Sequence, residues 1–93
     1  MRLTQQQRRA ILAQVRRHDP QAQVRIFGSR ARDDARGGDI DLLIYSNRFD
    51  RAALRELRID LQDALGEQHF DLVLHGRRPS AFARSVAREA VNL

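Results

Sequence analysis

Two short motifs in this chain carry residues whose types and spacing suit a specific chemistry. Gly28-Ser29 ends a short apolar run, and Asp39-Ile40-Asp41 opens a second apolar run after nine intervening residues. Two carboxylates separated by one residue point to the same face of a strand, roughly 6–7 Å apart. Hard divalent cations bind such carboxylates and phosphate oxygens together. A Gly-Ser turn at a helix start offers N–H groups and a hydroxyl to a phosphate. The combination predicts phosphoryl or nucleotidyl transfer.

A third carboxylate, Asp71, lies within a later apolar run, 70–74. An acidic side chain in an apolar strand is costly unless it is paired or binds a metal. If this strand lies beside the one that carries Asp39 and Asp41, three carboxylates converge, and one or two Mg²⁺ ions would offset their repulsion. Two-metal phosphoryl transfer uses such a site. We expect Asp39 and Asp41 to bind the metals, and Asp71 to bind the catalytic metal and to help deprotonate an acceptor hydroxyl.

The residues that follow Gly28 are expected to hold the phosphates. Ser29 and the N–H groups around it would bind the terminal phosphates, and Arg30 or Arg32 would neutralise phosphate charge. Each motif alone is weak, because Asp-x-Asp is common at strand ends and a lone strand aspartate more often pairs with an arginine. The order and spacing of all three motifs together favour an active site.

The composition limits the possible functions. The 93 residues predict a single domain, 1–93, and an apolar fraction of 42% argues against disorder. All 17 basic residues are arginine, and the net charge is +5. The lack of lysine excludes a Walker-type phosphate loop and Schiff-base chemistry, and the lack of cysteine excludes disulfides and a cysteine nucleophile.

Neither a membrane segment nor a nucleic-acid module is expected. No run approaches the roughly 18 apolar residues of a membrane span, and the N-terminus has no apolar signal core, so we predict a cytoplasmic protein. The arginines are spread along the chain without a stacking set of aromatic residues, so we do not expect direct nucleic-acid binding. The three histidines, at 18, 69 and 75, are scattered without metal-ligand spacing, and we expect no functional role for them.

The elements that must position these residues follow from the apolar periodicity and the caps. They predict an α/β (α+β) domain with a small mixed β-sheet of three or more strands, flanked by helices. The expected helices are 4–18, 29–35, 50–65 and 80–90, and the expected strands are 24–27, 39–45 and 70–74.

The motifs resemble those of the nucleotidyltransferase superfamily related to DNA polymerase beta. Its signature is Gly-Ser, then Asp-x-Asp on a strand, then a third Asp on a later strand. The sequences Phe-Gly-Ser-Arg-Ala-Arg at 27–32, Asp-Ile-Asp-Leu-Leu-Ile at 39–44 and Phe-Asp-Leu-Val at 70–73 look most like the minimal nucleotidyltransferases (MNT), the antitoxin partners of HEPN toxins. The resemblance covers nearly the whole chain.

The resemblance implies a palm-like mixed sheet, Mg²⁺ and ATP. It also implies transfer of AMP to a tyrosine hydroxyl of a HEPN-family RNase toxin, with which the chain would form a hetero-oligomer. Because a 93-residue core leaves no room for an acceptor domain, we expect the partner to present the acceptor. Two alternatives stay open: an antitoxin that neutralises the toxin by binding alone, and a nucleotidyltransferase for a small molecule such as an aminoglycoside.

Overall fold

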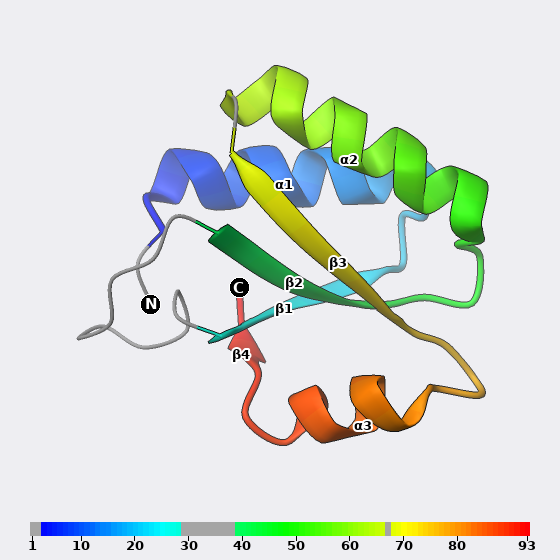
Figure 1. Ribbon diagram of the computed structural model, residues 1–93. Coiled ribbons are helices and arrows are strands. Elements are labelled where there is room, and N and C mark those ends of the chain that lie inside the picture. The colour runs from blue at the N-terminus through cyan, green and yellow to red at the C-terminus, as the bar shows by residue number, and fades with distance from the viewer. Residues whose placement is uncertain (1–2, 29–38, 67) are drawn as a thin grey trace.

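A four-stranded mixed sheet lies between two helices on one face and one helix on the other (Figure 1). The computed structural model describes residues 3–28, 39–66 and 68–93. The strand order is β3-β2-β1-β4, in which β1 pairs antiparallel with β2 and β4, and β2 pairs parallel with β3. In chain order the elements are α1 (Gln5–His18), β1 (Gln23–Phe27), β2 (Asp39–Tyr45), α2 (Arg51–Leu65), β3 (His69–His75), α3 (Ala81–Ala87) and β4 (Val91–Asn92).

Helix α1 begins at a reciprocal capping box. The Gln7 N–H donates to the Thr4 hydroxyl, and the Thr4 N–H donates to the Gln7 side chain, both at 3.0 Å. These two bonds satisfy N–H groups that a helix start otherwise leaves unpaired. Ile11 and Val15, one turn apart, are fully buried and fix which face of the helix meets the core.

Helix α2 is the crossover that joins the parallel strands β2 and β3. Asp50 caps its start by accepting a hydrogen bond from the Ala53 N–H, and Leu57 and Leu61 are fully buried on its inner face. Gly66 ends the helix at a φ of +90°, a conformation that side-chain-bearing residues rarely adopt. Parallel strands need such a long connection, so α2 determines how β3 aligns with β2.

Strand β2 presents different residues to its two faces. Ile40, Leu42 and Ile44 are fully buried in the core cluster that includes residues of α1 and α2. Asp39, Asp41, Leu43 and Tyr45 lie on the opposite face, where α3 packs. Helix α3 has only seven residues, and its contacts are with the middle of this face, against Leu43. The end of this face that carries Asp39 is exposed.

The predicted fold class is confirmed, and the differences are local. Strands 24–27 and 70–74 are longer than expected, by one and two residues, and the last helix ends at Ala87 rather than near Ala90. The two-residue strand β4 was not predicted, because two residues are too few to show alternation. The helix predicted at 29–35 lies outside the described residues. None of the described helices is long and apolar enough to cross a membrane.

Candidate active site

The parallel pairing of β2 and β3 brings acidic side chains together at one end of the sheet. In the register of the two strands Asp41 lies beside Asp71, and Asp39 lies beside His69. All four residues alternate onto the same face, since each strand contributes two residues separated by one position. The sequence-based expectation that Asp71 faces the Asp39/Asp41 pair is therefore met.

Asp41 has the most perturbed environment of the three aspartates. Burial, a hydrogen bond with the Asp71 carboxyl and the negative charges of Asp71 and Asp39 together raise the pKa of Asp41 from 3.8 to about 6, and nearby His69 offsets only part of this. A carboxyl group with a raised pKa holds a proton that an isolated one would release. The cluster therefore carries too much negative charge for its surroundings, and a bound cation would relieve that excess.

Asp71 also pairs with His69, which lies two residues before it on β3. The His69 Nε2 and the Asp71 Oδ1 are 3.0 Å apart. One ligand atom from each of Asp39, His69 and Asp71 lies within 4.8 Å of the other two. We expected no functional role for His69, and that expectation overlooked its place beside the acidic cluster.

Gly28 lies directly against the Asp41 carboxylate, at the end of β1. Its φ is +73°, and a Cβ atom built there would overlap the Asp41 Oδ2. Only glycine lets the backbone turn this close to the acidic cluster. The predicted phosphate ligands Ser29, Arg30 and Arg32 lie outside the described residues, so their contacts stay predictions.

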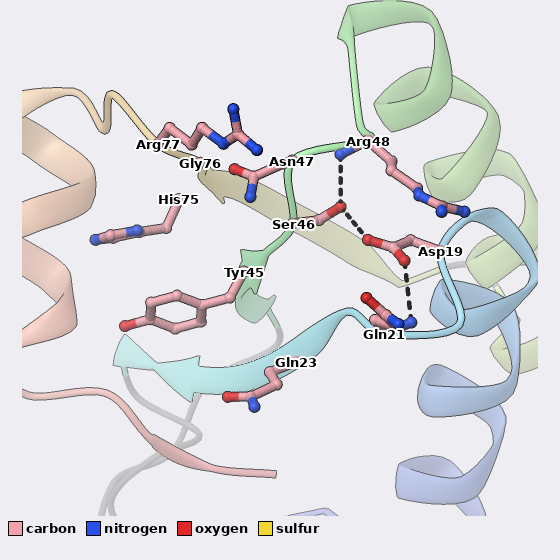
Figure 2. A pocket seen from close by; sticks show the side chains of 10 residues that line it. All are labelled: Asp19, Gln21, Gln23, Tyr45, Ser46, Asn47, Arg48, His75, Gly76 and Arg77. Carbon is pink, nitrogen blue, oxygen red and sulfur yellow. Dashed lines mark hydrogen bonds between the residues drawn. The ribbon is translucent and has the colours of Figure 1, made fainter.

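A hollow of about 530 Å³ lies at the opposite end of β2 from the acidic cluster (Figure 2). Its walls include Tyr45 and His75, whose rings lie 4.6 Å apart, and Arg48. Tyr45 is the last residue of β2 and Asp39 the first, so about 20 Å of strand separates the two sites. This hollow contains one aspartate, Asp19, whose carboxylate already accepts hydrogen bonds from the Ser46 hydroxyl and the Gln21 N–H.

Those bonds hold the pKa of Asp19 below its usual value, with the Ser46 hydroxyl contributing most. Asp19 thus links the end of α1 to the end of β2, and each of its carboxylate oxygens already accepts a hydrogen bond. The acidic end of the sheet, rather than the hollow beside Tyr45, therefore has the group of carboxylates that the sequence motifs predict.

The sequence pattern of the nucleotidyltransferase domain family matches residues 8–91, which contain β1, β2 and β3 and all three aspartates of the acidic site. This chain belongs to that family. The match confirms the resemblance to minimal nucleotidyltransferases of the polymerase beta-like superfamily, and the mixed sheet is the fold that the superfamily implies. Among curated proteins, none matches the chain.

Nucleotidyltransferases of this kind use a nucleoside triphosphate and a divalent metal, and the residues present fit such a cation. The donor set consists of carboxylate oxygens and one imidazole nitrogen, which are common ligands of divalent ions. Four of the seven predicted site residues are brought together: Gly28, Asp39, Asp41 and Asp71. The structure adds His69 to this group of residues. Its spacing could have indicated this, because His69 lies two residues before Asp71 on the same strand and so shares its face.

We predict that Gly28→Ala and Gly66→Ala both lower stability, but that only Gly28→Ala impairs metal binding. Both positions have positive φ, so each substitution costs about 1–2 kcal/mol. At Gly66 a new Cβ meets no atom within 4 Å, whereas at Gly28 it displaces the Asp41 carboxylate. Urea unfolding and Mn²⁺ titration check this, with an expected loss of at least about tenfold in affinity for Gly28→Ala. Equal Mn²⁺ affinities in the two variants would contradict the role of Gly28.

We predict that metal-free protein loses stability as pH rises from about 4 to about 6. In this range folded Asp41 keeps a proton that the unfolded chain has released, so the folded state binds more protons and is favoured at low pH. Asp41→Asn should remove this dependence and stabilise the metal-free protein at pH 7.5 by about 1 kcal/mol, a value reduced for solvent screening.

Urea unfolding in EDTA at several pH values measures this difference. The matched control is Asp63→Asn on the exposed surface of α2, whose free energy of unfolding should depend on pH as that of the wild type does. If the free energy of unfolding of Asp41→Asn equals that of the wild type at every pH, the proton that the folded state retains is not on Asp41.

Proposed function

We propose that this nucleotidyltransferase moves AMP from ATP, with Mg²⁺ or a similar cation, onto a hydroxyl of a HEPN-family RNase toxin and so acts as its antitoxin. The observation that carries the proposal is the convergence of Asp39, Asp41 and Asp71 beside the Gly28 turn at an open end of the sheet. Family membership supports nucleotidyl transfer. The choice of AMP and of a toxin hydroxyl extends the resemblance stated from the sequence motifs.

Each acidic residue has a proposed task in this reaction. Asp39, Asp41 and Asp71 would hold the divalent cations, which when bound neutralise phosphate charge and lower the pKa of an attacking hydroxyl. The acceptor oxygen forms a bond to the α-phosphorus while the bond to pyrophosphate breaks. Asp71 accepts the proton that the acceptor hydroxyl loses. Gly28 keeps the backbone close to Asp41, where the phosphates would enter next to the Ser29 N–H.

The open position of the site supports a protein acceptor. Asp39 is exposed, and the Asp71 side chain keeps 52% of its accessible surface. The residue Phe82 on α3 is 60% exposed, and its ring meets that of Phe27 edge-on with the ring centroids 6.4 Å apart. Phe27 is the β1 partner of Asp41, so this apolar surface borders the acidic end of the sheet. A protein partner could cover Phe82 while it presents a hydroxyl to the aspartates.

The electrostatic cost of the cluster favours catalysis over neutralisation by binding alone. Like charges held this close destabilise the metal-free fold, as the raised pKa of Asp41 indicates. An antitoxin that only covers its target would have no use for three converging carboxylates. A site that binds cations does, because the cations turn the repulsion into an attraction.

The test uses purified protein, ATP, Mg²⁺ and the product of a neighbouring gene, provided that gene encodes a HEPN-family protein. We expect intact-mass spectrometry to find AMP on the toxin with the wild type and with Asp63→Asn, and none with the double variant Asp39→Asn/Asp41→Asn. The double variant should stay folded, because amides replace carboxylates of equal size at exposed or half-exposed positions.

Three outcomes would count against the proposal. Labelling by the double variant would show that Asp39 and Asp41 are not essential. No labelling by the wild type would exclude AMP transfer to this partner. Inhibition of the toxin's RNase activity by the double variant without ATP would favour neutralisation by binding alone.

A further inference from the structure

We infer that His69 is a metal ligand of the acidic site, and that its nitrogen makes the site prefer a first-row transition-metal dication to Mg²⁺. The inference deepens the proposed function, since it concerns the cation of the same site. It rests on the position of His69 at the start of β3, next to Asp39 on β2 and two residues before Asp71.

The three side chains are close enough to bind one ion. Their ligand atoms lie within 4.8 Å of one another. Two ligands on opposite sides of one cation, with bonds of about 2.1 Å, are about 4.2 Å apart. Neighbouring ligands of one cation are closer, about 3.0 Å apart, which the His69–Asp71 separation of 3.0 Å already matches. Asp39 then has to move closer to the other two by between about 0.5 and 2 Å. The His69 side chain is 64% exposed and the Asp71 side chain 52%, so rotation of either is not blocked by packing.

A simple surface ion pair accounts less well for this arrangement. The chain has a half-buried histidine–aspartate pair elsewhere: His18 Nε2 lies 3.2 Å from Asp60 Oδ2, with the His18 side chain 18% exposed and its ring against Phe49. His18 belongs to none of the three-residue donor groups among the described residues, whereas His69 reaches both Asp71 and Asp39. Two carboxylates and one imidazole on adjacent strands make a mixed nitrogen and oxygen donor set.

The donor set determines which cation is favoured. Mg²⁺ binds oxygen ligands and keeps much of its water, so an imidazole contributes little to its affinity. First-row transition ions accept imidazole nitrogen readily. Among the first-row dications Mn²⁺ binds most weakly to a given site. A site that prefers Mn²⁺ to Mg²⁺ should therefore also prefer the other first-row dications to Mg²⁺.

His75 provides a matched control on the same strand. It is the last residue of β3 and lies on the same face as His69 and Asp71. Its ring stacks on Tyr45 at the opposite end of the sheet. A change at His75 therefore removes an imidazole from β3 without touching the acidic site.

The experiment measures Mn²⁺ bound to wild type, His69→Gln and His75→Gln at pH 8 without nucleotide. Pulsed electron paramagnetic resonance detects a nitrogen ligand on Mn²⁺ directly, and titrations with Mn²⁺ and Mg²⁺ give the affinities. We expect the nitrogen signal in wild type and His75→Gln and its loss in His69→Gln. We also expect about tenfold weaker Mn²⁺ binding in His69→Gln, with less than about a threefold change for Mg²⁺.

The outcomes separate this inference from the proposed function. Mn²⁺ binding without a nitrogen signal, or a signal retained in His69→Gln, overturns the inference even if AMP transfer occurs. A nitrogen signal from His69 without AMP transfer supports the ligand and overturns the proposed reaction. No Mn²⁺ binding by the wild type overturns the inference and the cation site together. Far-ultraviolet circular dichroism confirms that each variant is folded.

Discussion

Repulsion between carboxylates on two parallel strands is the constraint on which the candidate active site depends. Because β2 and β3 pair in register, Asp41 lies beside Asp71, and both side chains project from the same face of the sheet. Burial of Asp41, its hydrogen bond with Asp71 and the charges of Asp71 and Asp39 together raise the pKa of Asp41 to about 6. The fold thus holds a charge arrangement that is unfavourable alone and favourable around cations. That property supports the proposed cation site.

The rest of the structure maintains this arrangement by dividing the two faces of the sheet. The face toward α1 and α2 is apolar and mostly buried, and it supplies the packing that holds β2 and β3 in place. On the other face α3 packs against the middle, with the half-buried Tyr45 at one end of β2 and the exposed Asp39 at the other. Stability and chemistry therefore come from opposite faces of the same strands.

The local features of this fold could be read from the sequence. The cap at Thr4, the stop at Gly66 and the bounds of β2 all follow from short-range rules of hydrogen bonding and alternation. Features that depend on tertiary register could not. The alternation of β3 gives the face of Asp71, but only the path of α2 decides that His69 meets Asp39. The same limit applies to β4, whose two residues form a strand only because β1 offers an edge.

A crystal structure of the protein with Mn²⁺ and a non-hydrolysable ATP analogue would test the central claim most directly. The account predicts an anomalous Mn²⁺ peak between the carboxylates of Asp39 and Asp71, with the phosphates of the analogue next to Gly28. Mn²⁺ and the analogue bound instead in the hollow around Tyr45 and His75, with the acidic end empty, would contradict it.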